Sequence, residues 1–487
     1  MPTTDEDASV PVHRDSGRQQ RASTSSVDKK RRRPTPNGIW DPSVVKPPVA
    51  RPRIREPSLE SSRAVAAAEL ALYKQVKRVR SELTRMLGGN KGGEAAGEED
   101  AERRPQQQAL LVYERWLARA SLVEGGLAAP LLPAIDAEGG LKRDLIRHGA
   151  SEEDAARDAK AAAQRAGEAA ARWEKCRRGE GEDGDGLKVE DIVVRDSGSF
   201  IHLQLGSLKP YVKVTKTHLG KLRALWCRAC RRGQPLSSNI NSDEYKTFAY
   251  RVFALLMRYE SLGGSGYQAA LGEDAFDALK SNLGVSCEVF ASPLNCRYGS
   301  FCSQFFDVDK YFGSLGSFFS DKFEPTRGSF EMNPPFVPET ISKAVDKAES
   351  LLRRARESEE PLSFVVVVPA WKECKFWQAL SKSEFLRIPA ADIIAAEDHG
   401  FVDGAQHSRP ARERHRVSSY DTGVFYLQSP AAADLWTCTK TIRNRVLEKM
   451  KTAIGTCKNV KELEERYRGG GGKGGKRPKT NAYSSHV

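Results

Sequence analysis

The stretch Gly328-Ser329-Phe330-Glu331-Met332-Asn333-Pro334-Pro335-Phe336 decides how this chain of 487 residues is interpreted. Its first five residues are typical of a short strand, and the two prolines that follow Asn333 fix the backbone. A side-chain amide that can accept hydrogen bonds, two prolines and a flat aromatic ring together suit the binding of a planar molecule that carries an exocyclic NH2 group. A helix is predicted directly afterwards, over residues 339–357.

Alternating strands and helices surround this stretch. The predicted strands lie at residues 285–290, 364–368 and 423–427, and the predicted helices at 274–283, 339–357 and 376–385. Strands of this apolar kind, separated by helices, predict an α/β fold with a mostly parallel, doubly wound sheet. Ligands of such sheets bind at the carboxyl ends of strands. Three candidate sites fall there: residues 292–295, 333–336 and 369–371.

The chemistry of the central stretch favours methyl transfer to an amine. An aromatic amine is a weak nucleophile because its nitrogen lone pair is delocalised into the ring. Two acceptors aimed at its N–H bonds favour attack on a sulfonium methyl, and the Asn333 oxygen and Pro334 carbonyl are a suitable pair. Phe336 can stack on the base. The same pattern serves methylation of adenine N6, cytosine N4 and the glutamine side-chain amide, so it does not identify the substrate. Taken alone, Asn-Pro-Pro also favours an ordinary turn without a catalytic role.

The methyl-donor half is predicted from loops, since no GxGxxG motif is present. Ser292-Pro293-Leu294-Asn295 follows a predicted strand, and Asp307 or Asp309 precedes a loop that contains Gly313 and Gly316. Carboxylates can accept hydrogen bonds from ribose hydroxyls, and glycines let the backbone approach a ligand. Any one of these residues also fits an ordinary loop.

The charge balance favours a polyanionic partner. Lys and Arg total 77 against 64 Asp and Glu, which gives a net charge of +13. A basic group near residue 410 (Arg409, Arg412, Arg414 and Arg416) could hold phosphates or could be a solvated loop. No run approaches 18 consecutive apolar residues, so we expect no membrane-spanning helix and no membrane partner.

The cysteines and the N-terminus suggest a compartment. Nine cysteines and no hydrophobic leader predict an intracellular protein with reduced thiols. Cys227 and Cys230 form a lone CxxC without a second pair at suitable spacing, so no metal site is predicted. The run Lys29-Lys30-Arg31-Arg32-Arg33-Pro34 is typical of a nuclear-import signal, and also fits a solvated charge run. We expect a nuclear protein.

Composition divides the chain into five parts. They are a disordered basic tail (1–60), a helical region (61–186), a helical and β accessory part (187–285), the α/β core (286–430), and a C-terminal helix with a disordered Gly/Lys tail (431–487). Trp40 stands alone in the first part, and the next tryptophan is Trp116. A WW domain needs a second aromatic about twenty residues on, so none is expected.

Several runs together resemble the phosphorylated CTD-interacting-factor family of cap-specific adenosine N6-methyltransferases. The similar runs are 256–264, 268–271, 290–296, 309–314, 328–336, 362–371, 406–407 and 422–428. The resemblance covers roughly residues 190–430. It implies a helical domain joined to a Rossmann-like class I methyltransferase domain that uses S-adenosyl-L-methionine. The implied substrate is the capped RNA 5′ end, methylated at N6 of the 2′-O-methylated adenosine beside the 7-methylguanosine.

The resemblance also implies roles for individual residues. The catalytic motif falls on Asn333, Pro334, Pro335 and Phe336. The donor site falls on Ser292, Pro293, Leu294, Asn295, Asp309, Glu331 and Gln268. Substrate contacts fall on Trp371, Gln406, His407 and Arg409. The missing WW domain puts association with RNA polymerase II in doubt. The alternatives are internal RNA or DNA adenine methylation, and a catalytically silent RNA- or polymerase-binding protein with the same fold.

Overall fold

The computed structural model describes residues 38–43, 46–88, 98–178, 191–263 and 266–455. The nuclear-import run and the Gly/Lys tail lie outside these residues. The described residues belong to one compact unit, Pro36–Val487. None of the helices within it is long and apolar enough to cross a membrane.

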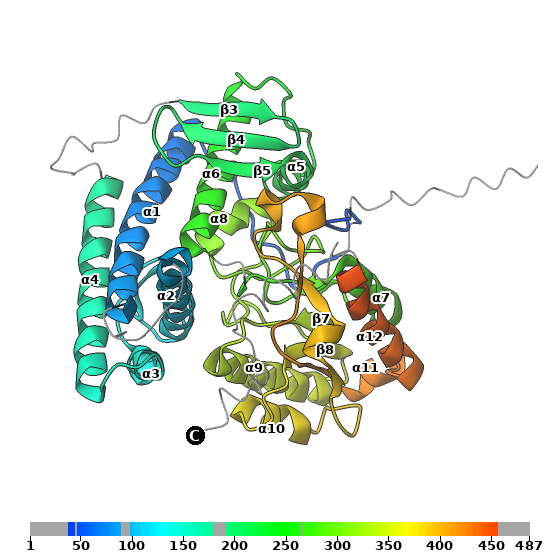
Figure 1. Cartoon of the computed structure of the whole chain (residues 1–487). Helices are drawn as coiled ribbons and strands as arrows, with labels where there is room; N and C mark the ends of the chain where they lie inside the picture. Colours follow the sequence, from blue (N-terminus) through cyan, green and yellow to red (C-terminus); the bar gives the residue numbers. More distant parts are fainter. Residues whose placement is uncertain (1–37, 44–45, 89–97, 179–190, 264–265, 456–487) are drawn as a thin grey trace, which may run out of the picture. The chain divides into compact units, whose positions relative to one another are not determined.

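A five-stranded sheet forms the centre of the α/β part (Figure 1). Its strands, in spatial order, are β6 (Cys287–Glu288), β7 (Gly328–Met332), β8 (Leu362–Pro369), β12 (Thr422–Gln428) and β9 (Asp392–Ile394). The pairs β6–β7 and β7–β8 are parallel, whereas β12 runs antiparallel to both β8 and β9. The predicted α/β class is confirmed. The expectation of a mostly parallel sheet is wrong for the β12 side, where β12 returns beside β8 in the opposite direction.

Helices cover both faces of this sheet, as the continuous apolar runs predicted. Phe364, Val366 and Val368 of β8 pack into one core with α9 (Pro338–Glu357) and α10 (Lys375–Lys382). Val365 and Val367 point to the other core, with α7 (Glu273–Leu283) and α12 (Lys440–Gly455). All eight residues of β8 are buried, so the strand is held from both sides.

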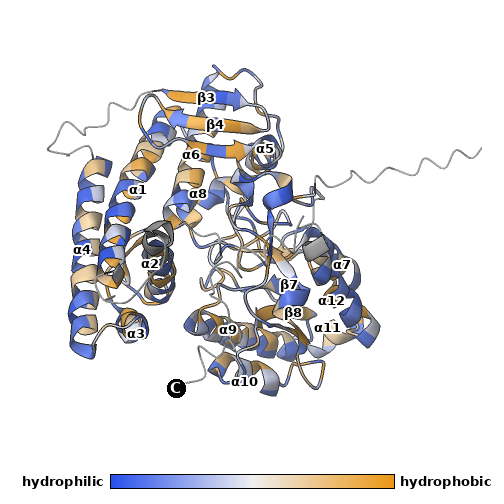
Figure 2. Cartoon of the chain, viewed as in Figure 1, coloured by the Kyte–Doolittle hydropathy of each residue, from blue (hydrophilic) through white to orange (hydrophobic). Residues whose placement is uncertain are grey.

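The helical region contains α1 (Leu59–Gly88), α2 (Glu98–Ala120), α3 (Gly140–Arg147) and α4 (Glu152–Arg178). Figure 2 shows hydrophilic and hydrophobic residues on both α1 and α4, as expected for amphipathic helices. Helix α1 lies beside α4 on one side and beside α6 (Asp243–Leu262) on another. Buried Arg258 of α6 donates to both carboxylate oxygens of buried Glu69 on α1, at 2.8 and 2.5 Å. This ion pair links α1 of the helical region to α6.

A small antiparallel sheet precedes the α/β part in the chain, in the order β3 (Ile192–Ser197), β4 (Phe200–Leu205) and β5 (Val212–Thr215). Thr215 caps α5 (Lys216–Cys230), because its side chain accepts from the amide of His218. The shorter elements are β1 (Leu127–Ala129), β2 (Leu132–Pro133), η1 (Ala137–Gly139), α8 (Phe306–Asp309), η2 (Lys310–Phe312), η3 (Ala396–Asp398), β10 (Gly400–Val402), η4 (Gln406–Ser408), η5 (Ala411–Glu413), β11 (His415–Val417) and α11 (Pro430–Leu435).

The segment before α1 differs from the expected disorder up to residue 60. Trp40 is buried, and the Arg228 guanidinium lies 5.5 Å from the centre of its ring. Arg51 donates to the carbonyl of Gly299 at 2.8 Å. Few apolar residues suffice here because the segment docks on an existing core instead of forming its own.

Candidate active site

Asn333 lies directly behind β7, at the carboxyl end of the parallel half of the sheet. Its side chain is almost buried, and Nδ2 faces the carbonyl of Ala269 at 3.5 Å. Pro338 then begins α9, where a proline costs no hydrogen bond. The strand, turn and helix therefore set Asn333 in place, as the sequence predicted.

A cavity of about 390 Å3 opens on one side of Asn333, and we call it the donor cavity. Gln268 and Asn295 line it, together with Asp307 and four phenylalanines (Phe290, Phe305, Phe318 and Phe319). The helical region contributes Ala118 of α2 and, directly after this helix, Ser121 and Leu122. The lining thus combines polar and aromatic side chains.

The loop after β6 is held by its own side chains. The amide and hydroxyl of Ser292 donate to Oδ1 of Asn295 at 2.7 and 2.9 Å. Nδ2 of Asn295 donates to the carbonyl of Gln268 at 2.9 Å. Lys221 of α5 is fully buried, and its Nζ donates to the carbonyls of Leu294 and Cys296. Of the predicted loop residues, Asn295 lines the cavity, whereas Ser292, Pro293 and Leu294 are buried within the loop.

Two aspartates of α8 have different surroundings. Asp307 lines the donor cavity, and the Arg258 guanidinium donates to it at 3.1 and 2.7 Å. Burial opposes the charge of Arg258, but Glu69 and Asp307 more than offset this and raise its pKa. Asp309 is fully buried, accepts from the Tyr259 hydroxyl at 2.9 Å, and is not part of the cavity lining. Burial raises the pKa of Asp309 to about 7. Of the two aspartates that the sequence offered, Asp307 lines the cavity, and the donor contact of Asp309 stays a prediction.

A second cavity, of about 300 Å3, opens on the other side of the motif, and we call it the acceptor cavity. It is lined by Leu111, Arg115, Gly266, Tyr267, Ala269, Asn333, Pro334, Pro335, Phe336, Phe401, Arg416, Val417, Ser418, Ser419 and Tyr420. Tyr267, Ala269, Asn333 and Pro335 also line the donor cavity. The two cavities therefore meet at the predicted catalytic asparagine.

Phe336 stands among other aromatic rings in the acceptor cavity. Its ring centre lies 6.2 Å from that of Phe401 and 6.4 Å from those of Trp371 and Tyr420. Trp371 also packs edge-on against Tyr420 at 5.2 Å. The structure thus brings Trp371 to the back of the site, where it supports Phe336 and Tyr420.

Four predicted contacts are not brought to either cavity. Gln406 and His407 belong to η4 and are buried, and Gln406 Oε1 lies 3.4 Å from Nε2 of His218. Burial lowers the pKa of His407 to about 4. Arg409 lies 3.6 Å from Asp403. Glu331 lies opposite Glu288 in the register of the adjacent strand β6. Burial, together with the nearby Glu288 carboxyl, raises the pKa of Glu331. None of these four residues lines either cavity, and their contacts with donor or substrate stay predictions.

The acceptor cavity contains residues that the sequence did not indicate. Leu111 and Arg115 come from α2, and Tyr267, Phe401 and Tyr420 come from loops and a short strand far apart in the chain. Leu111 is 46% exposed although it belongs to an amphipathic helix, and an exposed apolar residue is a weak signal of a binding surface.

Cysteine and histidine positions bear on the metal prediction. Cys230 of α5 donates from Sγ to the carbonyl of Tyr311 at 3.4 Å, and burial raises the pKa of Cys230 to about 12. Within the described ranges, no three His, Cys, Asp or Glu side chains are grouped so that they could hold a metal ion.

Known proteins are similar to the central region of the chain. The family model described as "Phosphorylated CTD interacting factor 1 WW domain" matches residues 221–404. Two relatives are each named mRNA (2′-O-methyladenosine-N(6)-)-methyltransferase. The one from Homo sapiens is 37% identical over 235 residues, which are 47% of this chain and 31% of the relative. The one from Mus musculus is 35% identical over 232 residues, which are 46% of this chain and 31% of the relative.

The description of the family model contradicts our expectation that no WW domain is present. That expectation used the surroundings of Trp40 alone, whereas the match begins within α5. In the structure, the matched residues include α6, β7 and β8. We withdraw the expectation. The chain covers less than a third of each relative, and over the shared region the resemblance to the phosphorylated CTD-interacting-factor family is confirmed.

Proposed function

We propose that this protein is an S-adenosylmethionine-dependent methyltransferase with a Rossmann-like class I core. Its proposed substrate is N6 of the 2′-O-methylated adenosine next to the cap of mRNA. The observation that carries the proposal is the place of Asn333 in the wall shared by the donor and acceptor cavities. The similarity to the two named methyltransferases supports the substrate.

The residues of the donor cavity fit a nucleoside that carries a charged amino-acid tail. Asp307, oriented by Arg258, offers acceptors for hydroxyl groups. The ring centres of Phe318 and Phe319 lie 5.5 and 5.7 Å from that of Phe290, which gives an apolar wall for a base. When bound, S-adenosylmethionine would supply an electrophilic methyl group.

The motif residues hold the amine. Because Nδ2 of Asn333 faces the Ala269 carbonyl, Oδ1 is directed to accept a hydrogen bond from an N–H group of the substrate. The Pro334 carbonyl is the second acceptor in this proposal, and the prolines on either side of it restrict its direction. Phe336 offers a face for the base, and the rings around it limit its rotation. A positioned polar group of this kind contributes about 3–4 kcal/mol to the transition state.

The acceptor cavity suits a nucleic-acid end. Arg115 and Arg416 lie in its wall and can bind phosphates, while Tyr267, Phe401 and Tyr420 offer apolar surface for bases. A 5′-terminal nucleotide can enter such a cavity without the cost of opening a duplex. We assign the phosphate role to Arg416 in place of Arg409.

Two other functions remain alternatives. Internal adenine methylation of RNA or DNA requires the same motif, and would not depend on a cap. A silent binding protein would keep the fold without turnover, although the accessible Asn333 and Phe336 favour catalysis. We also propose a nuclear location, and the description of the family model makes a phosphorylated polymerase tail a second candidate partner.

Incubation of the full chain with labelled S-adenosylmethionine tests the proposal. The RNAs should differ only in the cap, the 2′-O-methyl group and the first nucleotide, and the products should be separated as nucleosides. We expect N6-methylated 2′-O-methyladenosine from capped RNA that begins with adenosine. Equal methylation of uncapped RNA would contradict cap specificity, and equal methylation of an internal adenosine would favour the first alternative.

A further inference from the structure

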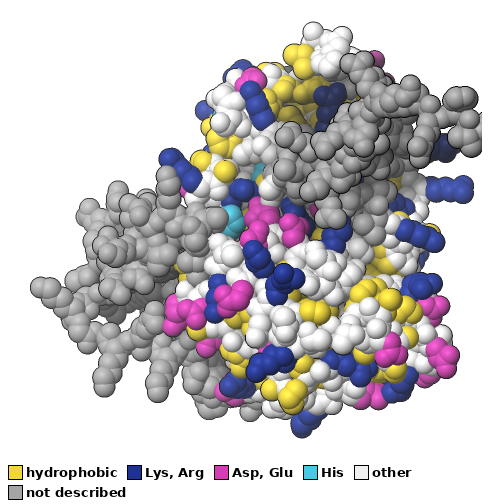
Figure 3. All heavy atoms as spheres, turned by 90° about the vertical axis from the view of Figure 1, so that its right-hand side faces the viewer, with side chains coloured by type: hydrophobic (Ala, Val, Ile, Leu, Met, Phe, Trp, Pro, Cys, Tyr) yellow, Lys and Arg dark blue, Asp and Glu magenta, His cyan; other side chains and the backbone are white. Residues whose placement is uncertain are grey.

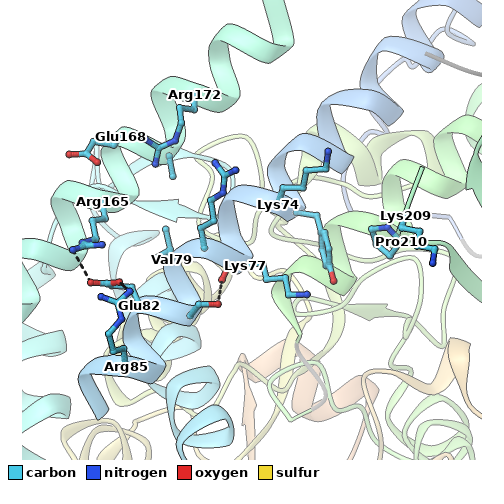
Figure 4. A pocket seen from close by; sticks show the side chains of 14 residues that line it. Lys74, Lys77, Val79, Glu82, Arg85, Arg165, Glu168, Arg172, Lys209 and Pro210 are labelled. Carbon is cyan, nitrogen blue, oxygen red and sulfur yellow. Dashed lines mark hydrogen bonds and ion pairs between the residues drawn. The ribbon is translucent and has the colours of Figure 1, made fainter. Parts of the chain in front are cut away.

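A hollow of about 820 Å3 lies between α1 and α4, outside the two cavities that meet at Asn333 (Figure 4). Seven of its lining residues are Lys or Arg and two are Glu. The cations come from three separate segments: Lys74, Lys77, Arg78 and Arg85 from α1, Arg165 and Arg172 from α4, and Lys209 from the loop before β5. We call this hollow the basic groove.

The groove keeps a large positive excess after its internal contacts are considered. Glu82 is nearly buried and binds Arg85 and, at 3.0 Å, Arg165, so it joins α1 to α4. Arg78 and Arg172 both donate to Oε1 of Gln75, which is neutral. In the part of the chain that the structure describes, no carboxylate forms an ion pair with Lys74, Lys77 or Lys209. A site with this balance attracts a polyanion.

Another face of the molecule offers a contrast. On the face shown in Figure 3, Lys and Arg side chains are spread among Asp and Glu side chains. Figure 4 shows the labelled cations of α1 and α4 arranged around one hollow. Several segments contribute cations to one hollow, so the basic groove differs from the solvated charged face of a single helix.

The groove and the acceptor cavity border the same junction of helices. Arg80 of α1 lies between the groove residues Val79 and Ser81, and its guanidinium donates to the carbonyl of Ser261 near the end of α6 at 3.3 Å. Its charge also acts on buried Glu114 of α2, the neighbour of Arg115 in the acceptor cavity. These contacts place α1 beside α2, the helix that supplies Arg115 to the acceptor cavity.

We propose that the basic groove binds the phosphate backbone of single-stranded RNA downstream of the methylated 5′ nucleotide. This inference rests on the proposed function for the direction of the RNA, but the groove's affinity for RNA does not depend on catalysis. Arg and Lys from three segments match the repeated phosphates of a backbone, and Tyr73 in the lining offers a ring for one base. The backbone contacts would be independent of sequence.

The first test measures binding alone. Full-length protein is titrated into a fluorescent, uncapped 20-nucleotide RNA without methyl donor, and anisotropy is followed at several salt concentrations. The variant Lys74→Glu with Lys77→Glu should bind roughly tenfold more weakly, and its plot of log K against log salt should be shallower by about 1.4, for two lost phosphate contacts. Lys74→Arg with Lys77→Arg should bind like the unmodified protein.

A matched control reverses two exposed lysines that line no described cavity, Lys382→Glu with Lys440→Glu, and should leave affinity within about twofold. Equal RNA affinity for the groove variant and this control would overturn the proposal. So would a phosphorylated peptide or an anionic vesicle that binds the groove more tightly than RNA does.

A second test separates the groove from the proposed reaction. Lys74→Glu with Lys77→Glu should methylate a capped trinucleotide normally but show a raised KM for a capped 30-nucleotide RNA. If the unmodified protein methylates neither substrate while the groove still binds RNA, the proposed function fails and the groove assignment stands. If both substrates are affected equally, the groove assignment fails.

Discussion

The donor and acceptor cavities share Asn333 but are assembled in different ways. The donor cavity is built mainly from residues between 267 and 340, which follow two neighbouring parallel strands. The acceptor cavity takes Arg115 from α2, Phe336 from the motif and Tyr420 from a loop after β11. Strand-end loops fix the first cavity, whereas packing between distant segments forms the second. If this division is also functional, a substitution in one cavity should leave binding in the other cavity unchanged.

Asn333→Ala should have the largest effect because it removes an acceptor on which both cavities converge. We expect turnover to fall by about 100- to 1,000-fold, with affinity for S-adenosylmethionine within threefold of the unmodified protein. Transfer of a labelled methyl group and calorimetric titration of the donor measure the two quantities.

Asn282→Ala is the matched control, since Asn282 lies on α7, where its side chain donates to the Ala278 carbonyl and accepts from Arg445, and it lines neither cavity. It should keep full turnover. Unchanged turnover in Asn333→Ala would refute the catalytic role of the motif.

Asp307→Asn should affect the donor side alone. The substitution keeps the shape of the side chain but removes the charge that Arg258 orients at the cavity wall. The Kd for S-adenosylmethionine should rise about tenfold, while the KM for capped RNA stays constant. Asp321→Asn, at an exposed position outside the cavity, serves as the control. If the KM for capped RNA rose in place of the Kd for S-adenosylmethionine, the result would contradict separate roles for the two cavities.

The sequence predicted the motif and the donor loop because both depend on local chemistry. Asn333 follows an apolar strand and precedes a helix, and the Ser292–Asn295 turn closes on itself. Side-chain direction was harder to predict. Asp307 and Asp309 are two residues apart, and only the packing of Tyr259 beside Asp309 decides which of them is buried. Leu111 and Arg115 could not be found from their surroundings in the sequence, because α2 reaches the site only through tertiary packing.

Arg416→Ala should affect the acceptor side alone, and more weakly than Asp307→Asn affects the donor side. The Arg416 side chain is 34% exposed and lies 3.3 Å from Asp403, so solvent and this partner screen its contribution. The KM for capped RNA should rise about three- to fivefold and the Kd for S-adenosylmethionine should stay constant. Arg412→Ala, at a 74% exposed position that lines neither cavity, should change neither value. A loss of donor affinity in Arg416→Ala would show that the cavities are coupled.

Asp309→Asn should have the smallest effect on methyl transfer, because Asp309 supports the donor cavity from behind and is not part of its lining. Its effect should instead appear in stability. Burial raises the pKa of Asp309 to about 7 in the folded protein, against about 3.9 in the unfolded chain. The folded state therefore binds more protons between these values, and its stability falls as pH rises from about 4 to about 7.

Asparagine stays neutral, so Asp309→Asn lacks this loss. The free energy of unfolding of the variant should therefore increase relative to that of the unmodified protein by about 2–3 kcal/mol between pH 5 and pH 8, which means that the variant becomes relatively more stable. Urea denaturation at four pH values measures it, and methyl transfer at pH 6 should remain within about twofold. The same pH series on Asn282→Ala, which changes no ionisable group, is the control and should follow the unmodified protein. Equal pH profiles for Asp309→Asn and this control would mean that the burial of Asp309 does not set the pH dependence of stability.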